Sequence, residues 1–335
     1  MEKNVISHKI GIIGYGKMGQ TRHQALIELG GCEVLAISDP NSSAHPESIK
    51  NVSHNEIINH AEIDIVIVCT PNYLNMELTI RALEAGNHVF CEKPPCFTAS
   101  EARMIMHAEN RSGKKLMYGF NHRHHDSIIK MKELIDGGEM GKVLWSRGRY
   151  GKSVTEDYAS QWRAKKEFAG GGILMDQGIH MLDLFLHLSG SYDVVKAEVS
   201  NLYWKMDVED NAFVILKDSQ SGRVASLHST MTQWRHLFSL EIFMEHGYMV
   251  LNGLITSTMS YGEEVLSVAR NRSEAPVATW KDEVKTHYTT NNSWRYEMEH
   301  FINAINNNTD VSIGTSTDAL QLMTIMDKIY EQKDF

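Results

Sequence analysis

The chain has 335 residues, of which 42% are hydrophobic and 22% are charged, and its formal net charge is -9. This length and composition are typical of a globular protein with two domains of ordinary size, and the net negative charge argues against general affinity for nucleic acid or anionic membranes. No apolar run reaches the roughly 18 residues needed to span a bilayer, and residues 1–8 lack a signal-peptide core, so we expect a cytoplasmic protein. Four cysteines without metal-ligand spacing are expected to be reduced thiols: Cys32, Cys69, Cys91 and Cys96.

Residues 9–19 predict a dinucleotide-binding turn. A short apolar strand runs into a glycine-rich turn, and a helix is predicted over residues 17–29. In such a turn the first glycine permits a sharp bend, the second lets a pyrophosphate approach the backbone, and the third lets helix and strand pack closely. A glycine-rich turn alone is a weak signal, but here the preceding strand, the following helix and a downstream acid agree. The predicted cofactor-binding turn comprises Gly14, Tyr15, Gly16, Lys17, Met18 and Gly19.

A second predicted strand, residues 33–38, ends at Asp39. An acid about 20 residues beyond the glycine turn accepts hydrogen bonds from the adenosine ribose hydroxyls. Its carboxylate would repel the 2′-phosphate of NADP, and no arginine follows in residues 40–43, so the prediction is NAD. The alternative is that Asp39 serves only as the turn residue of an Asp-Pro pair.

Two further strands, residues 63–69 and 88–91, are predicted in the first domain, with a small helix over residues 53–59 and a longer one over 74–85. Loops at the carboxyl ends of parallel strands line the ligand crevice. A lysine followed by two prolines at such a strand end is held in place as surface lysines seldom are. We therefore predict further cofactor contacts from Cys69, Thr70, Pro71, Asn72, Glu92 and Lys93.

The motif Glu92-Lys93-Pro94, placed after a Rossmann fingerprint, resembles that of the Gfo/Idh/MocA oxidoreductases, and the likeness extends over essentially the whole chain. The resemblance implies an α/β fold with an N-terminal, doubly wound parallel Rossmann sheet and a C-terminal α+β domain on a large, mostly antiparallel open sheet. It implies that Lys93 lies near nicotinamide and substrate. We place the first domain at residues 1–121 and the substrate and oligomerisation domain at 122–315, with the helix 316–332 packing back on the first.

The predicted strand 116–120 ends in Asn121-His122-Arg123, which resembles the family's entry into the second domain. The resemblance assigns Asn121 to the cofactor and Arg123 to the substrate. The nearby His122, His124, His125 and Asp126 lack a second ligand cluster, so we predict no metal site and instead a helix over 127–136 capped by Asp126. Consecutive strands without intervening helices favour an antiparallel sheet, and they are predicted at 142–149, 194–204, 211–216, 223–232, 238–244 and 248–251.

A helix over residues 173–188 follows three glycines at 170–172. Asp176 and His180, four residues apart, would share one helix face, in a polar stripe that continues with Asp183 and His187. Such a stripe is often only the solvated face, but glycines that permit close backbone approach favour a ligand cleft. The arrangement of three glycines, Asp176, Gly178 and His180 also resembles the family's catalytic helix.

Alcohol oxidation needs a base near neutral pH for the hydroxyl proton, and histidine titrates in that range. We assign His180 as this base, Lys93 as the group that favours an alkoxide-like oxygen, and Asp176 as the group that orients the hydroxyl. The division resembles the family's Lys-Asp-His set. Which of Lys93 and His180 moves the proton stays open.

The loop 152–168 lies between a strand and the catalytic helix, so we expect it to border the substrate. Its aromatic and basic residues resemble those of members that act on sugars or nucleotide sugars, but an oligomer contact is an equal alternative. His228 and residues 234–236 are further candidate neighbours. The predicted substrate-binding residues are Lys93, Arg123, Tyr150, Tyr158, Trp162, Arg163, Asp176 and His180.

These features predict an NAD-dependent dehydrogenase acting on a secondary alcohol of a sugar, nucleotide sugar or cyclitol. The alternatives are a ketoreductase that uses NADH on a keto-sugar and a non-catalytic NAD-binding sensor. A sensor would not need Lys93, Asp176 and His180 together. The open sheet is expected to pair with further copies as a homodimer or homotetramer.

Overall fold

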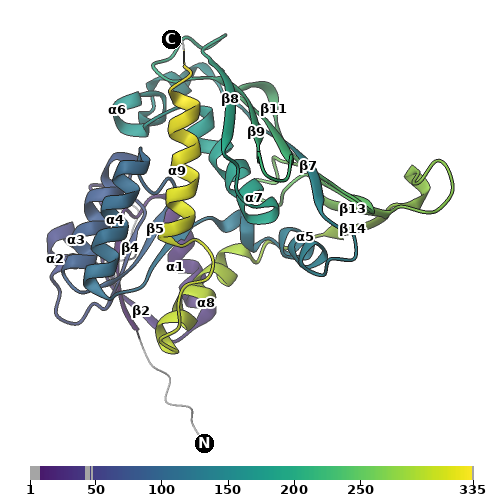
Figure 1. The fold of residues 1–335 in the computed structure, drawn as a ribbon. Coiled ribbons are helices and arrows are strands. Elements are labelled where there is room, and N and C mark those ends of the chain that lie inside the picture. The colour runs from purple at the N-terminus through teal and green to yellow at the C-terminus, as the bar shows by residue number, and fades with distance from the viewer. Residues whose placement is uncertain (1–7, 42–45, 47, 334–335) are drawn as a thin grey trace, which may run out of the picture. The chain divides into compact units, whose positions relative to one another are not determined.

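The computed structural model describes residues 8–41, 46 and 48–333, and Figure 1 labels its elements. They form two compact units, one comprising the chain up to Asn121 with residues 293–323, the other residues 122–292 with the chain from Thr324 onward. Residues 293–315, which we had assigned to the second domain, therefore belong to the first unit. The helix α9 (Ser316–Tyr330) is divided between the units, so its last residues belong to the second and not to the first as expected.

Among the described residues, the first unit contains a parallel sheet of six strands: β1 (His8–Ile13), β2 (Cys32–Ser38), β3 (Lys50–Asn51), β4 (Ile65–Val68), β5 (His88–Glu92) and β6 (Leu116–Gly119). Their order, β3-β2-β1-β4-β5-β6, confirms the predicted doubly wound Rossmann sheet. All four residues of β4 are apolar and buried, as expected for an inner parallel strand covered on both faces.

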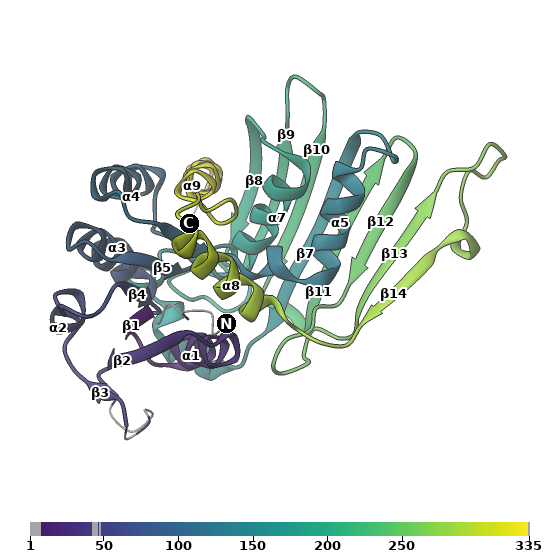
Figure 2. The same cartoon turned by 90° about the horizontal axis from the view of Figure 1, so that it is seen from below.

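Helices cover both faces of this sheet. Figures 1 and 2 show α2 (His54–Ile58), α3 (Asn75–Glu84) and α4 (Ala99–Ser112) along one face and α1 (Lys17–Leu29) and α8 (Ser293–Asn306) along the other. Local sequence determines several helix ends. Ser53 and Thr98 each form a capping box with the glutamate three residues later, and Gly113 ends α4 in the left-handed conformation.

A buried arginine explains why α8 belongs to the first unit. The guanidinium of Arg22, on α1, is inaccessible to solvent and bonds Glu92 at the end of β5 and Glu297 on α8. It also lies over the rings of Phe90 and Trp294, with its central carbon 4.3 and 4.8 Å from the ring centres. Burial opposes its charge, but Glu297 and Glu92 raise the pKa of Arg22 above its ordinary value. Three elements distant in sequence are thereby joined.

We predict that Arg22→Met destabilises the protein by about 3–5 kcal/mol, because it leaves two buried carboxylates without their cation. Urea unfolding of the variant and the parent measures the difference. Arg81→Met is the control: it breaks the exposed pair with Glu77 and should change the free energy of unfolding by about 1 kcal/mol or less. Equal effects of the two changes would contradict a special role for Arg22.

In the described part of the second unit, eight strands form one sheet: β7 (Val143–Ser153), β8 (Val194–Ser200), β9 (Asn211–Lys217), β10 (Val224–Thr230), β11 (Thr232–Met244), β12 (Gly247–Asn252), β13 (Glu264–Arg270) and β14 (Val284–Tyr288). Their order is β14-β13-β12-β11-β7-β10-β9-β8. Among the strand pairs described in this sheet, only β7 and β10 pair in parallel, which confirms the predicted mostly antiparallel sheet. The sequence analysis missed β13 and β14. The edge strand β14 is mostly polar and exposed, so it lacks an apolar alternation.

Figure 2 shows α5 (Asp126–Asp136) and α7 (Ile179–Ser189) on one face of this sheet. The prediction that Asp126 caps α5 is wrong. His125 occupies the cap position, and Asp126 is the first helical residue, whose carboxylate accepts a hydrogen bond from Asn292. The side chain of His125 instead pairs with Glu264 of β13, so it ties the helix to the sheet.

Candidate active site

The three glycines of the first turn have three different surroundings. Gly14 has a φ of +87°, and a Cβ there would lie 2.4 Å from the carbonyl oxygen of Cys69. A Cβ on Gly19 would lie 2.2 Å from the carbonyl oxygen of Gly14, whereas no described atom lies within 4 Å of a Cβ built on Gly16. The first glycine thus makes the bend, the third allows close packing, and the second faces open space. This is the division of roles that a pyrophosphate-binding turn requires.

The start of α1 suits an anion. Gly16 is its cap residue, no described side chain caps it, and its first turn, which opens with Lys17 and Met18, has no acidic residue. The unpaired N–H groups of a helix N-terminus and the helix dipole both favour phosphate. Residues 14–19 therefore fit the pyrophosphate of NAD. When bound, NAD would accept or supply hydride through its nicotinamide ring.

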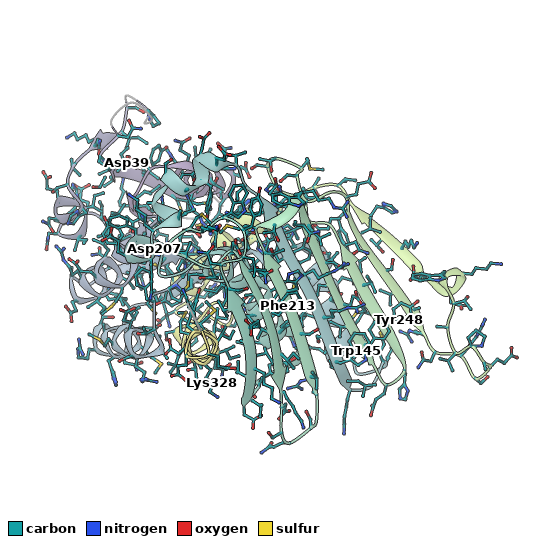
Figure 3. All side chains as sticks on the ribbon, turned by 90° about the horizontal axis from the view of Figure 1, so that it is seen from above. Asp39, Trp145, Asp207, Phe213, Tyr248 and Lys328 are labelled. Atoms are coloured by element: carbon teal, nitrogen blue, oxygen red, sulfur yellow. The ribbon has the colours of Figure 1, made fainter. Side chains whose placement is uncertain are left out.

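Asp39 is held beside this turn at the end of β2 (labelled in Figure 3). Its two carboxylate oxygens accept the backbone N–H groups of Tyr15 at 2.6 Å and Asn41 at 2.8 Å, and Asn51 bonds its backbone on both sides. A carboxylate offers about four acceptor positions, so the ribose hydroxyls have positions left. The contact with Asn41 is also what an Asx turn would show, so Asp39 is both turn residue and ribose-binding candidate.

Asn75, which the sequence analysis did not single out, orders the loop that carries Lys93. Its fully buried side chain donates to the carbonyls of Glu92 at 3.2 Å and Pro94 at 2.8 Å, one on each side of Lys93, and accepts from Thr70. The carboxylate of Glu92 is buried against Arg22, and the cofactor contact of this residue stays a prediction. The sequence signal for Asn75 is its position at the start of a helix, directly after the predicted cofactor loop that contains Thr70, Pro71 and Asn72.

We predict that Gly16→Ala weakens NAD binding at least about tenfold, or 1.4 kcal/mol, while the protein folds normally, because the new methyl group fills the space of the pyrophosphate. Gly19→Ala should instead lower stability by about 1–3 kcal/mol, because its methyl group meets the Gly14 carbonyl. Fluorescence titration with NADH and thermal unfolding measure the two effects. Unchanged affinity in Gly16→Ala would contradict this site.

In the second unit the predicted helix 173–188 is not uniform. Residues Leu174–Gly178 form a π-helical turn (η6), and α7 begins only at Ile179. The argument from four-residue spacing in an α-helix is therefore wrong for Asp176, which lies in the wider turn, while His180 lies in the first turn of α7. Such π turns are frequent at functional sites.

Two of the three glycines before this turn, Gly171 and Gly172, pack closely against other parts of the chain. A Cβ on Gly172 would lie 2.0 Å from the carbonyl oxygen of Glu209, and one on Gly171 would lie 2.0 Å from the hydroxyl of Tyr330. The buried Glu209 carboxylate accepts the N–H groups of Gly172 at 2.8 Å and Leu174 at 3.1 Å and the Tyr330 hydroxyl at 2.8 Å. Our use of these glycines as a sign of a ligand cleft was wrong; they allow Glu209 to hold the start of the π turn.

Asp176 is paired with a lysine that the predicted site lacked. The ammonium of Lys152, on β7, lies 2.6 Å from Oδ2 of Asp176, 3.4 Å from the Tyr158 hydroxyl and 4.6 Å from the Tyr158 ring centre. Burial alone would lower the pKa of Lys152, but Asp176 and Tyr158 raise it above its ordinary value, so the ammonium is charged. Alternation along the strand could have indicated Lys152, because it shares a face with Tyr150.

His180 stacks on His122, with ring centres 3.9 Å apart. Nε2 of His122 lies 2.9 Å from the hydroxyl of Tyr150, whose ring lies 5.3 Å from that of Tyr261. The Tyr261 hydroxyl donates to Gln177 on the π turn. Burial raises the pKa of Tyr150 well above its usual range, so it stays a neutral phenol. His122, which we had interpreted only as a member of a cluster without metal, thus lies beside the proposed base.

Of the remaining predicted residues, Arg123 and Asn121 are buried, whereas Trp162 and Arg163 lie at the surface. Arg123 is buried and makes two bonds, at 2.8 and 2.6 Å, to Asp183, which is itself buried and not on a solvated stripe. This pair ties the chain to α7, and Arg123 as a substrate ligand stays only a prediction. Asn121 donates to Ser293. Trp162 and Arg163 stack on each other at the surface, with the guanidinium carbon 4.4 Å from the ring centre.

The further candidates His228, on β10, and His236, on β11, lie on different sides of the sheet. His228 stacks on Phe213, on the sheet face opposite Tyr150, so it is no neighbour of Asp176. His236 lies against Tyr261, with ring centres 4.8 Å apart, and so it is near the Asp176 side. Within the described ranges, no group of three ligating side chains that could hold a metal ion is found, and no helix is long and apolar enough to cross a membrane.

The fold and the glycine turn define the chain as a two-unit protein with an NAD-binding Rossmann unit. Residues 8–120 match the family model for the oxidoreductase family with an NAD-binding Rossmann fold, and residues 128–250 match the GFO/IDH/MocA C-terminal domain. The chain belongs to the Gfo/Idh/MocA oxidoreductase family.

Curated relatives are matched over part of their length. The chain is 30% identical to levoglucosan dehydrogenase of Pseudarthrobacter phenanthrenivorans, over 57% of this chain and 53% of the relative, and 31% identical to D-glucoside 3-dehydrogenase of Escherichia coli, over 60% and 59%. The chain thus spans somewhat over half the length of these relatives. A solved levoglucosan dehydrogenase in complex with NADH shares the fold, with a TM-score of 0.85 at 24% identity over 97% of this chain and 96% of that one.

Proposed function

We propose that the protein is an NAD-dependent dehydrogenase that oxidises a secondary alcohol of a sugar, nucleotide sugar or cyclitol. The observation that carries the proposal is the pairing of Asp176, on the π turn, with the half-buried ammonium of Lys152, in the same unit as a histidine stacked in a histidine-tyrosine cluster. Family membership and the names of the relatives, which are sugar and inositol dehydrogenases, support it.

The residues divide the chemistry as follows. His180 takes the hydroxyl proton in oxidation and returns it in reduction. Asp176 accepts a hydrogen bond from the substrate and orients it, and Lys93 stabilises negative charge on the reacting oxygen. The Asn75 bonds to the carbonyls on both sides of Lys93 restrict its loop, which supports a fixed role for this lysine. The cofactor is NAD and not NADP, because the Asp39 carboxylate would repel a 2′-phosphate.

The open face of the second sheet supports a homo-oligomer, a dimer or tetramer, in which this face is covered by another copy. Figure 3 shows Trp145, Phe213 and Tyr248 on this face, away from α5 and α7. Phe213 and Ile215 are 51% and 52% exposed, and Trp145 stacks on Phe243, with ring centres 4.1 Å apart. Exposed apolar side chains on a sheet face, here together with the Arg147–Glu241 ion pair, are typical of an interaction site.

The proposed function is tested by following NADH absorbance while the protein meets panels of free sugars, inositols and sugar nucleotides with NAD and, separately, NADP. One panel member should reduce NAD in preference to NADP, and His180→Ala should lower its turnover about 10²–10⁴-fold, because the base is lost. If no member reacts in either direction while NAD binds, the dehydrogenase proposal is wrong and the sensor alternative gains.

Lys93→Met should keep NAD affinity within about twofold and lower kcat by at least about 10²-fold, because the missing charge acts on the reacting oxygen and not on the glycine turn. Stopped-flow turnover and NADH titration separate the two quantities. Lys114→Met, at a lysine outside the proposed site, is the matched control and should change neither. Normal turnover in Lys93→Met would remove this lysine from the mechanism.

A further inference from the structure

The pair formed by Lys152 and Asp176 differs from the other buried ion pairs of this chain. Arg22 and Arg123 are enclosed, with side chains 0% and 3% exposed, and Arg123 makes two parallel bonds to its carboxylate. Lys152 and Asp176 keep 12% and 19% of their side chains exposed and share one contact. An arginine fork suits a closed structural pair, whereas an ammonium with three rotatable donors can bond a further oxygen besides those of Asp176 and Tyr158.

The sheet is irregular opposite Lys152. Strand β11 pairs with β7 at Thr232 with Ser153 and at Leu237 with Gly151, so the four residues 233–236 lie opposite one residue, Lys152. Such bulges re-aim side chains and occur next to active sites. Here the bulge carries His236 against Tyr261, and it contains a tryptophan with a φ of +58°, a conformation that bulky residues rarely adopt.

Irregular backbone thus adjoins both partners of the pair. Asp176 lies on the π turn that Glu209 holds, and Lys152 faces the bulge. Burial and the nearby Lys152 charge lower the pKa of His236, so its imidazole is mostly neutral. Lys152 is therefore surrounded by polar groups and remains partly exposed to solvent. The π turn and the bulge both depart from regular structure, and a purely structural ion pair needs neither.

We propose that Lys152 is a substrate-binding residue and that Lys152 and Asp176 together recognise two adjacent hydroxyls of an uncharged ring. Asp176 accepts a hydrogen bond from one hydroxyl, and Lys152 donates to the oxygen of the neighbouring one. This inference rests on the proposed function and narrows its substrate class. An acidic group at either position would meet the Asp176 charge and an amino group would meet the Lys152 charge, so both are disfavoured there.

The test measures how strongly Lys152 and one substrate hydroxyl depend on each other. Calorimetric titration of the NADH-bound protein uses methyl β-D-glucopyranoside, its 2-, 3- and 4-deoxy analogues, myo-inositol, D-glucuronate and D-glucose 6-phosphate as probes. In the parent, a neutral ring should bind, and removal of one hydroxyl of the recognised pair should weaken binding about 10- to 100-fold. In Lys152→Met the same removal should cost less than about twofold, because its partner is gone.

Two further variants keep the test decisive. Lys130→Met removes an exposed lysine of α5 and should leave every ratio unchanged. Lys152→Arg keeps the charge and should retain a measurable penalty for the missing hydroxyl, so it serves if Lys152→Met unfolds. An equal penalty in the parent and in Lys152→Met, or preferential binding of D-glucuronate or D-glucose 6-phosphate, would overturn the proposal.

The binding measurement needs no hydride transfer, so the two proposals fail separately. A ring that binds with the expected dependence on Lys152 but is never oxidised would retain Lys152 as a ligand and overturn the dehydrogenase. A ring that is oxidised with no dependence on Lys152 would retain the dehydrogenase and overturn Lys152 as a substrate ligand. Lys152→Met should also raise KM far more than it lowers kcat, because a uniformly lost binding contact acts on KM.

Discussion

The buried guanidinium of Arg22 is the interaction on which the first unit depends. It joins α1, which starts at the pyrophosphate-binding turn, to the end of β5, which leads to Lys93, and to α8, from a distant part of the chain. A single charged group in a water-free interior must be paired, so the three elements cannot separate without a large electrostatic cost. The same contact buries the Glu92 carboxylate against Arg22, and Asn75 restricts the loop beyond it.

The second unit uses a carboxylate for a comparable purpose. Gly172 leaves room for the backbone of Glu209 and Gly171 for the hydroxyl of Tyr330, and the Glu209 carboxylate accepts the N–H groups at the start of the π turn. Burial raises the pKa of Glu209, while the Gly172 N–H and the Tyr330 hydroxyl oppose that rise. Asp176 is thereby carried on a turn wider than an α-helix, where it can pair with Lys152 across to the sheet.

The two faces of the second sheet carry different sets of side chains. Along β7, Tyr150 and Lys152 point to the face covered by α7, where they meet His122 and Asp176, while Trp145 points to the opposite, open face. Alternation of side chains along a strand makes this separation unavoidable. One strand can therefore carry residues of the proposed site on one face and of the proposed contact between copies on the other, and His228 lies on the open face.

Sequence alone predicted the Rossmann turn, Asp39 as a candidate for the ribose, and the alternation of strands and helices up to Asn121 apart from the short β3, because glycine geometry, capping boxes and continuous apolar strands are local properties. It also identified Asp176 and His180 as candidates. Tertiary structure decided their neighbours: Lys152 reaches the π turn from β7 and Glu209 reaches it from the loop before β9. His122 stacks on His180, and Asp183 pairs with Arg123. These partners are distant in sequence, and a polar stripe on a helix does not show whether solvent or a buried counter-ion faces it, because only packing determines that.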